Sequence, residues 1–370
     1  MSRFDSKIRS ILYAAFLFLW AFPAWSQVTY GNQELARGGI STNSFKILGF
    51  SRDNQKLFAI EKVNDIRRLA KGSAFYLRVM DVRLDLRIST INTYLLPVRE
   101  IDGIAFSDDG RKVLISGDYG TRFLELNVPT RAIRTIFQRQ KGQAGFRSQT
   151  ILVYRKGQFI SEGYRYDDQG YYLNTAVVKL DLAHANSPSL FQETWNVTQT
   201  EKKLGPRMRE FLATATTAYL IPKPASKEYT LWYYNNGALT QVDKGPEFGG
   251  WAGTEDRLLY TVDRGDKDHK IRSVILKDFQ SGKSWTLSES TALYTYPYLA
   301  DEGRLAIVSL FDVIDKKPVI SFFYAREHHG FTIKPIPELQ KMPLGIFRPS
   351  DDGQFYIFQN QKGITLGRIP

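Results

Sequence analysis

Beyond residue 26, the hydrophobic residues of this chain fall in short runs and not at helical intervals. Each run is rich in Val, Ile, Tyr, Phe and Thr and is bounded by Gly, Asp, Asn or Pro. Runs of this length and composition are typical of short antiparallel strands. The pattern therefore predicts an all-β chain, and an all-β chain of 370 residues calls for a search for internal repeats.

One hairpin-like segment recurs along the chain. Its clearest copies lie at residues 50–60, 106–116 and 348–358, where a Ser is followed two positions later by Asp and then by Asn or Gly. Weaker copies are marked by Gly157, Thr217, Asp256 and Gly303. The Asp-Gly or Asp-Asn pair predicts a type I′ hairpin turn, because that turn needs residues with positive φ.

These turn markers recur about every 50 residues, which is the period of a four-stranded propeller unit. We therefore expect a seven-bladed β-propeller, with six or eight blades as the alternatives. After Gly353 the last unit has room for one more strand only, Ile364 to Ile369. The region Val28 to Tyr30 is expected to supply the missing outer strand and close the ring, which would protect the sheet edges.

The Ser-x-Asp-Gly core resembles the repeat of the periplasmic Tol-type and prolyl-oligopeptidase-type propellers, whose units carry a Ser-Pro-Asp-Gly turn. Three units carry the resemblance well and four carry it loosely. It implies a fold and no particular activity. The catalytic α/β-hydrolase domain of prolyl peptidases is not expected, because the chain contains no G-x-S-x-G motif.

The first 26 residues have the three-part pattern of a secretory signal peptide. Arg3, Lys7 and Arg9 precede an uncharged stretch from Ile11 to Ala24, and Ala24-Trp25-Ser26 offers small residues for cleavage before Gln27. The alternative is a membrane anchor, but a span needs about 20 apolar residues. We expect a cleaved signal peptide at 1–26, a single propeller domain at 27–370, and a periplasmic or secreted bacterial protein with no transmembrane segment after cleavage.

The amino-acid composition excludes several kinds of functional site. The chain has no cysteine, which excludes disulfides, thiolate metal sites and cysteine nucleophiles. It has only four histidines, and no metal site or cofactor is expected. With 50 Lys and Arg against 38 Asp and Glu, its formal charge is +12, so an acidic partner fits the charge.

The expected propeller fold also predicts on which face of the ring each loop lies. The Asp-Gly turns share one face of the ring, here called the turn face. The connections after the second strand of each unit, and those between units, share the opposite face, here called the loop face. We expect a ligand site on the loop face, where carboxylates, guanidinium groups and aromatic rings suit acid–base work, sugar stacking or protein contacts. The candidate residues are Arg99, Glu100, Asp102, Tyr164, Arg165, Tyr166, Asp167, Trp251 and Tyr296.

A basic stretch offers a second candidate site. Between Glu125 and Glu162 there is no acid, and the candidate residues for polyanion binding are Arg131, Arg134, Arg139, Lys141 and Arg147. Outside the cytoplasm a polyanion means an anionic glycopolymer or lipid headgroups and not nucleic acid.

The favoured function is a monomeric, exported, non-enzymatic propeller that binds a cell-envelope protein or glycan through loop-face residues. The alternatives are a hydrolase or lyase acting on a glycan or peptide, and a polyanion binder that uses residues 131–156.

Overall fold

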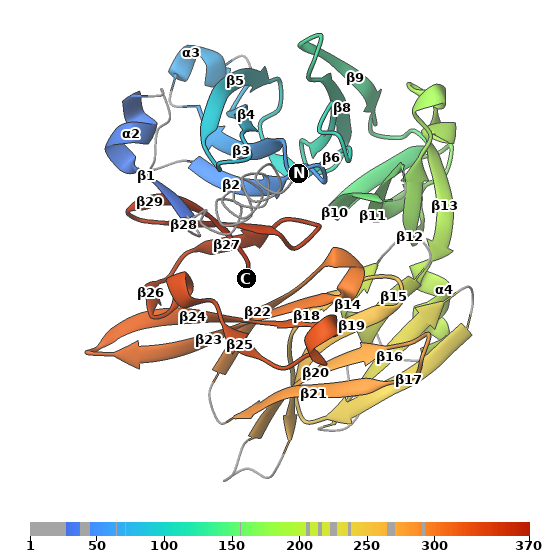
Figure 1. Ribbon diagram of the computed structural model, residues 1–370. Helices are drawn as coiled ribbons and strands as arrows, with labels where there is room; N and C mark the ends of the chain where they lie inside the picture. The colour runs from blue at the N-terminus through green and yellow to red at the C-terminus, as the bar shows by residue number, and fades with distance from the viewer. Residues whose placement is uncertain are drawn as a thin grey trace, which may run out of the picture.

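The strands are arranged as separate sheets around a common centre (Figure 1). The computed structural model describes residues 27–370 except 38–44, 64, 71, 156, 205–207, 214–216, 223–227, 236–237, 265–270 and 291–292. The predicted signal peptide, residues 1–26, lies outside the described residues. Within them the strands form seven sheets, and the prediction of an all-β propeller is confirmed.

In six sheets, strands that follow one another in sequence pair antiparallel. The first sheet contains β2 (Phe45–Phe50), β3 (Lys56–Lys62), β4 (Phe75–Val82) and β5 (Ile88–Leu96). The second contains β6 (Ile101–Phe106), β7 (Lys112–Gly117), β8 (Arg122–Asn127) and β9 (Ala132–Gln138). The third contains β10 (Gly145–Arg155), β11 (Gln158–Tyr166), β12 (Tyr172–Leu180) and β13 (Phe191–Asn196). The fourth sheet contains β14 (Met208–Ala213), β15 (Thr217–Pro222), β16 (Tyr229–Asn235) and β17 (Ala238–Gly245). The fifth contains β18 (Phe248–Gly253), β19 (Arg257–Arg264), β20 (Ile271–Asp278) and β21 (Ser284–Ser290). The sixth contains β22 (Leu293–Ala300), β23 (Leu305–Ile314), β24 (Lys317–Arg326) and β25 (Lys334–Pro335), and β26 (Met342–Pro343) also pairs with β24.

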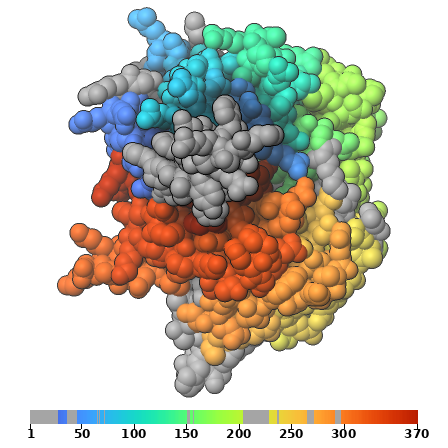
Figure 2. Space-filling model, viewed as in Figure 1, coloured from blue at the N-terminus to red at the C-terminus, as the bar shows by residue number. Residues whose placement is uncertain are grey.

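The seventh sheet, here called the closing sheet, joins the two ends of the described chain. It contains β27 (Ile346–Pro349), β28 (Phe355–Asn360), β29 (Gly363–Arg368) and β1 (Gln27–Gly31). β1 pairs antiparallel with β29, so that Val28 lies opposite Leu366 and Tyr30 opposite Ile364. The two segments lie side by side in Figure 2, in blue and red. The pairing of Val28–Tyr30 with the last strand, expected from the sequence, is confirmed.

Helices make up little of the described chain and only connect strands. They are α2 (Asn32–Arg37), α3 (Ile66–Ala70) and α4 (Val197–Leu204), with 3₁₀ turns at Leu182–His184, Pro188–Leu190, Asp301–Gly303, Glu327–His329 and Pro337–Leu339. Among the described residues, no helix is both long and apolar enough to cross a membrane.

The core lies between neighbouring sheets. Phe58 of β3 stacks on Phe106 of β6, with ring centroids 4.2 Å apart. Phe322 of β24 packs in the same way against Phe347 of β27 in the closing sheet, at 4.5 Å. Burying each such side chain stabilises the fold by about 1.5–3 kcal/mol, so these aromatic residues hold the sheets in place around the centre.

The repeated turn has a different geometry from the one expected. In the copy at Ser107, the backbone N–H of Gly110 donates to the carbonyl of Ser107 at 2.8 Å, and Gly110 has φ 62°. Asp108 and Asp109 are not left-handed, so this is not a type I′ turn; it resembles a type I turn followed by one left-handed residue. The type I′ prediction is therefore wrong for this copy, and Asn54 and Gly353 occupy the same left-handed position in the other two clear copies.

Side chains close the same turn. The hydroxyl of Ser107 donates to Asp109 Oδ1 at 2.6 Å and accepts from the backbone N–H of Lys112 at 3.0 Å. Asp109 Oδ1 also accepts from the N–H of Arg111 at 3.0 Å. The pairs Ser51–Asp53 and Ser350–Asp352 repeat these contacts at 2.5 and 2.6 Å. The Ser and Asp of the repeat are therefore structural residues, whereas the residue between them is not needed to form the turn.

Candidate ligand-binding site

The residue between Ser and Asp in each clear copy of the repeat lines a cavity at the centre of the ring. These residues are Arg52, Asp108 and Asp351. Arg155, Glu255 and Glu302 come to the same cavity from the weaker turns of sheets β10–β13, β18–β21 and β22–β25. We call this space, of about 570 Å³, the axial cavity.

The axial cavity lies at the turn face, opposite the face where the sequence suggested a ligand site. Its wall is made of the turns themselves and of the last residues of inner strands, such as Ile104–Phe106 of β6 and Leu299–Ala300 of β22. A volume of this size suits a small ligand or a short segment of a larger one.

Backbone contacts between turns fix the positions of two lining residues. The carbonyl of Asp108 accepts from the N–H of Asp53 in the neighbouring sheet at 3.3 Å. The carbonyl of Asp351 accepts from the N–H of Asp301 at 2.6 Å. Each of these turns is therefore held by the turn beside it, which fixes the backbone from which each carboxylate extends.

Two arginines cross the mouth of the cavity. Arg52 donates to Glu302 at 3.1 Å and lies 3.8 Å from Asp108, so it links sheets β2–β5, β6–β9 and β22–β25. Arg155 donates to the carbonyl of Gly253 in sheet β18–β21 at 3.4 Å. Among the described residues, the lining contains five carboxylates (Asp108, Glu255, Asp256, Glu302 and Asp351) and two guanidinium groups, which gives this part of the wall a formal charge of −3.

Asp351 differs from the other carboxylates of the clear repeats. Its side chain is exposed to the open space of the cavity. Desolvation by the surrounding protein raises the pKa of Asp351, although the charges of Arg155 and Arg52 act in the opposite direction. A carboxyl with this environment is a candidate ligand contact.

On the loop face, the structure brings three predicted residues together. Glu100 raises the pKa of the Tyr119 hydroxyl, Asp102 accepts from the N–H of Gly120 at 2.6 Å, and Arg147 donates to the carbonyl of Tyr119 at 2.7 Å. Desolvation raises the pKa of Asp102, against the hydrogen bond from Gly120. Two carboxylates, a phenol and a guanidinium thus meet where β6 and β10 begin.

Other predicted loop-face residues have structural partners. The backbone N–H of Arg99 donates to the carboxylate of Asp118 at 2.8 Å, and the guanidinium of Arg165 donates to Glu193 at 2.6 Å. Tyr164 accepts a hydrogen bond from Gln149 and packs edge-on against Tyr172.

Asp167 accepts from the N–H groups of Gln169 and Tyr171 and so shapes the turn between β11 and β12. Tyr166 lies under the guanidinium of Arg139, whose carbon is 3.6 Å from the ring centroid.

The remaining two predicted ligand residues belong to other sheets. Trp251 is half-buried on β18 and packs against the cluster of Phe248, Leu258 and Tyr260. Tyr296 lies on β22, and its side chain is outside the described part of the structure.

The basic stretch does not form one surface. Arg131 lies in the turn between β8 and β9 on the turn face and contacts Asn92 at 3.0 Å. Arg134 is paired with Glu125 at 2.5 Å. Arg139, Lys141 and Arg147 lie beyond the far end of β9, which is about 20 Å long. One contiguous polyanion would therefore meet only part of this set.

A buried carboxyl on β11 stands outside every predicted set of site residues. Glu162 is 3% exposed, and its Oε1 has no hydrogen-bond partner. Burial raises the pKa of Glu162 to about 7. In the part of the chain that is described, no group of three or more His, Asp or Glu side chains is placed to hold a metal ion.

Sequence reasoning missed the axial cavity, although the repeat contained the signal. Aligning the copies shows Ser and Asp recurring while the residue between them changes from Arg52 to Asp108 to Asp351. A charged position that varies inside a structural motif is a candidate for recognition.

Comparisons with known proteins support the fold alone. No protein-family model and no curated protein matches the sequence. Among solved structures, an oligogalacturonate lyase in complex with manganese superposes with a TM-score of 0.54 at 12% identity, over 87% of this chain and 88% of that one. The acylaminoacyl peptidase of Pyrococcus horikoshii superposes with a TM-score of 0.54 at 8% identity, over 88% of this chain and 51% of that one.

The β-propeller domain of the trilobed protease from Pyrococcus furiosus gives a TM-score of 0.52 at 10% identity, over 85% of this chain and 91% of that one. These matches confirm the fold-level resemblance to prolyl-oligopeptidase-type propellers that the sequence suggested.

Proposed function

We propose that this chain is an exported, non-enzymatic binding propeller whose axial cavity receives a partner or ligand of the cell envelope. The observation that carries the proposal is the charged wall of the cavity. Its residues come from turn positions that the fold does not require for turn formation, as Arg52, Asp108 and Asp351 show. In this proposal each of the seven sheets serves as one blade.

The cavity chemistry favours recognition over catalysis. Arg52 is paired with Glu302, and Arg155 contacts a backbone carbonyl, so the charges are held in a preset arrangement. Preset polar groups in a cavity fix the orientation of a bound molecule.

The second candidate function is that of a hydrolase or lyase at the loop face. It is favoured by the meeting of Glu100, Asp102, Tyr119 and Arg147, and by the raised pKa of Asp102, which is the kind of perturbation that acid–base residues show. Hydrolysis or elimination of an envelope glycan that is abolished by Asp102→Asn, with the fold intact, would establish this function and displace the first.

The natural absence of cysteine allows a direct test of the binding site. A single cysteine is introduced at Asp108 in the axial cavity, at Tyr119 on the loop face, or at Leu84, which is 87% exposed and lies in the turn between β4 and β5. Each variant is labelled with a photo-crosslinker and irradiated in envelope extract, and adducts are identified by mass spectrometry and reproduced with the purified partner.

We expect a specific adduct from Asp108→Cys and none from Leu84→Cys. An adduct from Tyr119→Cys alone would move the site to the loop face. No adduct from either position would contradict the binding function.

Export is tested separately. We expect the mature protein in the extracytoplasmic fraction, with an intact mass that matches a chain beginning at Gln27. Retention of residues 1–26 in a membrane fraction would show an anchor instead.

A further inference from the structure

We propose that the axial cavity binds a cationic organic group, a primary amine or a guanidinium, against the carboxylate of Asp351. The inference rests on the proposed function, because it assumes that the axial cavity is the binding site, and it goes further by naming the chemistry of the ligand.

Two adjacent carboxylates show why Asp351 is the contact. Asp352 accepts from the hydroxyl of Ser350 at 2.6 Å, from the N–H of Gln354 at 3.0 Å and from the side-chain amide of Asn54 at 2.6 Å. Among the described residues, no group donates a hydrogen bond to the carboxylate of Asp351. One carboxylate is thus saturated by the turn, while the other keeps its acceptor capacity for a ligand.

The position of Asp351 is nevertheless fixed. Its carbonyl is held by Asp301 at 2.6 Å, and the turn behind it is closed by Ser350. A carboxylate that extends from a fixed backbone and lacks donors does not have to exchange an internal partner for the ligand, which lowers the cost of reorganisation on binding.

The charge of the cavity selects the sign of the ligand. Arg52 is hydrogen-bonded to Glu302 and lies beside Asp108, and its charge, like that of Arg155, also acts on Asp351. The lining acids that the structure describes nevertheless outnumber the two arginines, and together these residues carry a formal charge of −3. Such a wall attracts cations and repels anions.

Hydrogen-bonding capacity selects an organic cation. Ammonium and guanidinium groups carry several N–H donors and match a carboxylate through charge-assisted hydrogen bonds. The carbonyl of Gly303, which already accepts from Arg257 at 3.2 Å, shows that the turns of this face offer backbone acceptors to a guanidinium.

The test measures binding of defined probes by isothermal titration calorimetry. The probes are spermidine, lysine amide and Nε-acetyl-lysine amide, which differ in the number and position of their positive charges, and hexanoate, which is an anion. The variant is Asp351→Asn, which keeps the size of the side chain and removes its charge. The matched control is Asp168→Asn, an exposed acid in the turn between β11 and β12.

We expect saturable binding of spermidine and lysine amide that weakens at least about tenfold in Asp351→Asn, is unchanged in Asp168→Asn and falls as salt is added. Hexanoate should not bind, and Nε-acetyl-lysine amide should bind more weakly than lysine amide. Thermal melting of Asp351→Asn should match the parent, since no hydrogen bond is removed.

Equal binding in the parent and in Asp351→Asn, preference for the anion, or no saturable binding of either amine would overturn the inference. The crosslinking experiment distinguishes a failure of the cationic-ligand proposal from a failure of the proposed binding function. A partner adduct at Asp108→Cys that persists while the amines fail would retain the axial cavity as a binding site and reject its cationic ligand.

Discussion

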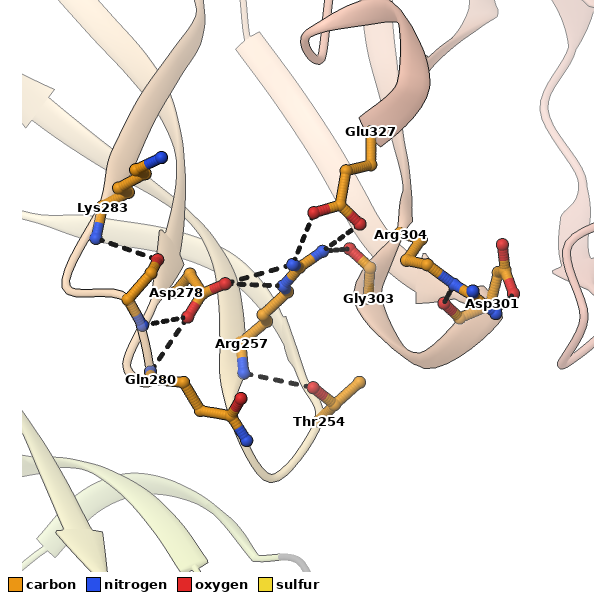
Figure 3. Close-up of polar contacts among 10 residues, drawn as sticks. Thr254, Arg257, Asp278, Gln280, Lys283, Asp301, Gly303, Arg304 and Glu327 are labelled. Atoms are coloured by element: carbon orange, nitrogen blue, oxygen red, sulfur yellow. Dashed lines mark hydrogen bonds and ion pairs between the residues drawn. The ribbon is translucent and has the colours of Figure 1, made fainter.

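Arg257 at the start of β19 holds Glu327 of the neighbouring sheet through two hydrogen bonds, Nη1 to Oε2 at 3.0 Å and Nη2 to Oε1 at 2.8 Å (Figure 3). The same guanidinium pairs with Asp278 at 3.1 Å and reaches the carbonyl of Gly303 at 3.2 Å. The hydrogen bond and charge of Arg257 lower the pKa of Glu327. One side chain therefore joins sheets β18–β21 and β22–β25 close to the turn face.

Replacing Arg257 by Met should destabilise the fold by about 2–4 kcal/mol, because Asp278 would remain as a buried carboxylate without its cation. Denaturant unfolding at pH 7 measures the loss. The control is Arg304→Met, since Arg304 is 56% exposed and its pair with Asp301 should contribute less than about 1 kcal/mol. Equal midpoints for the two variants would contradict the coupling of the sheets through Arg257.

Glu162 should make stability fall as pH rises. Its folded pKa of about 7 lies above its usual value of 4.5, so its contribution is fully present below pH 4.5 and is lost as pH rises through about 7. Glu162→Gln removes this loss. The variant should be more stable than the parent at pH 8, by up to about 3 kcal/mol, and nearly equal to it at pH 4.5.

Thermal melts at several pH values, with the exposed Glu34→Gln as control, measure this difference. A difference that does not change with pH would show that Glu162 does not titrate in the folded protein.

The repeated motif should divide into structural and recognition residues. Ser107→Ala removes two hydrogen bonds of the turn and should cost about 1–2 kcal/mol. Asp108→Ala removes only a distant ion pair with Arg52, at 3.8 Å, and should change stability by less than about 0.5 kcal/mol. Urea titration of both variants tests the division, and a larger cost for Asp108→Ala would remove the basis for assigning that position to ligand binding.

Ring closure should be sensitive to the loss of β1. Deleting residues 27–32 bares the edge of β29 and removes the hydrogen bond from the N–H of Ile88 to the hydroxyl of Tyr30, at 2.7 Å. We expect a loss of several kcal/mol, on the order of one hydrogen-bonded strand with its buried side chains, and aggregation through the edge.

Calorimetry and light scattering follow the two effects. A comparison variant, Gln33→Ala, changes an exposed residue just beyond the deletion and should leave both properties unchanged. A truncated protein that melts with the parent and stays monomeric would show that the ring does not depend on this strand.

The sequence by itself determined what is local. Ser107, Asp109 and Gly110 form their turn through contacts within six residues, so the repeat could be recognised and the strands placed. The position of β1 followed from counting strands, because the last unit lacked one. The type of turn did not follow, since Asp-Gly is compatible with several turns and the approaching strands select among them.

Only the tertiary structure decided which charges are free and where they meet. Asp351 and Asp352 are neighbours of one residue type, yet Asn54 from another sheet and Ser350 saturate the second and leave the first facing the axial cavity. Arg134 looked like part of a basic patch until the pairing of β8 with β9 placed Glu125 beside it. The physical reason is that pairing and solvation depend on groups far apart in the chain, and the charge of a local stretch does not contain that information.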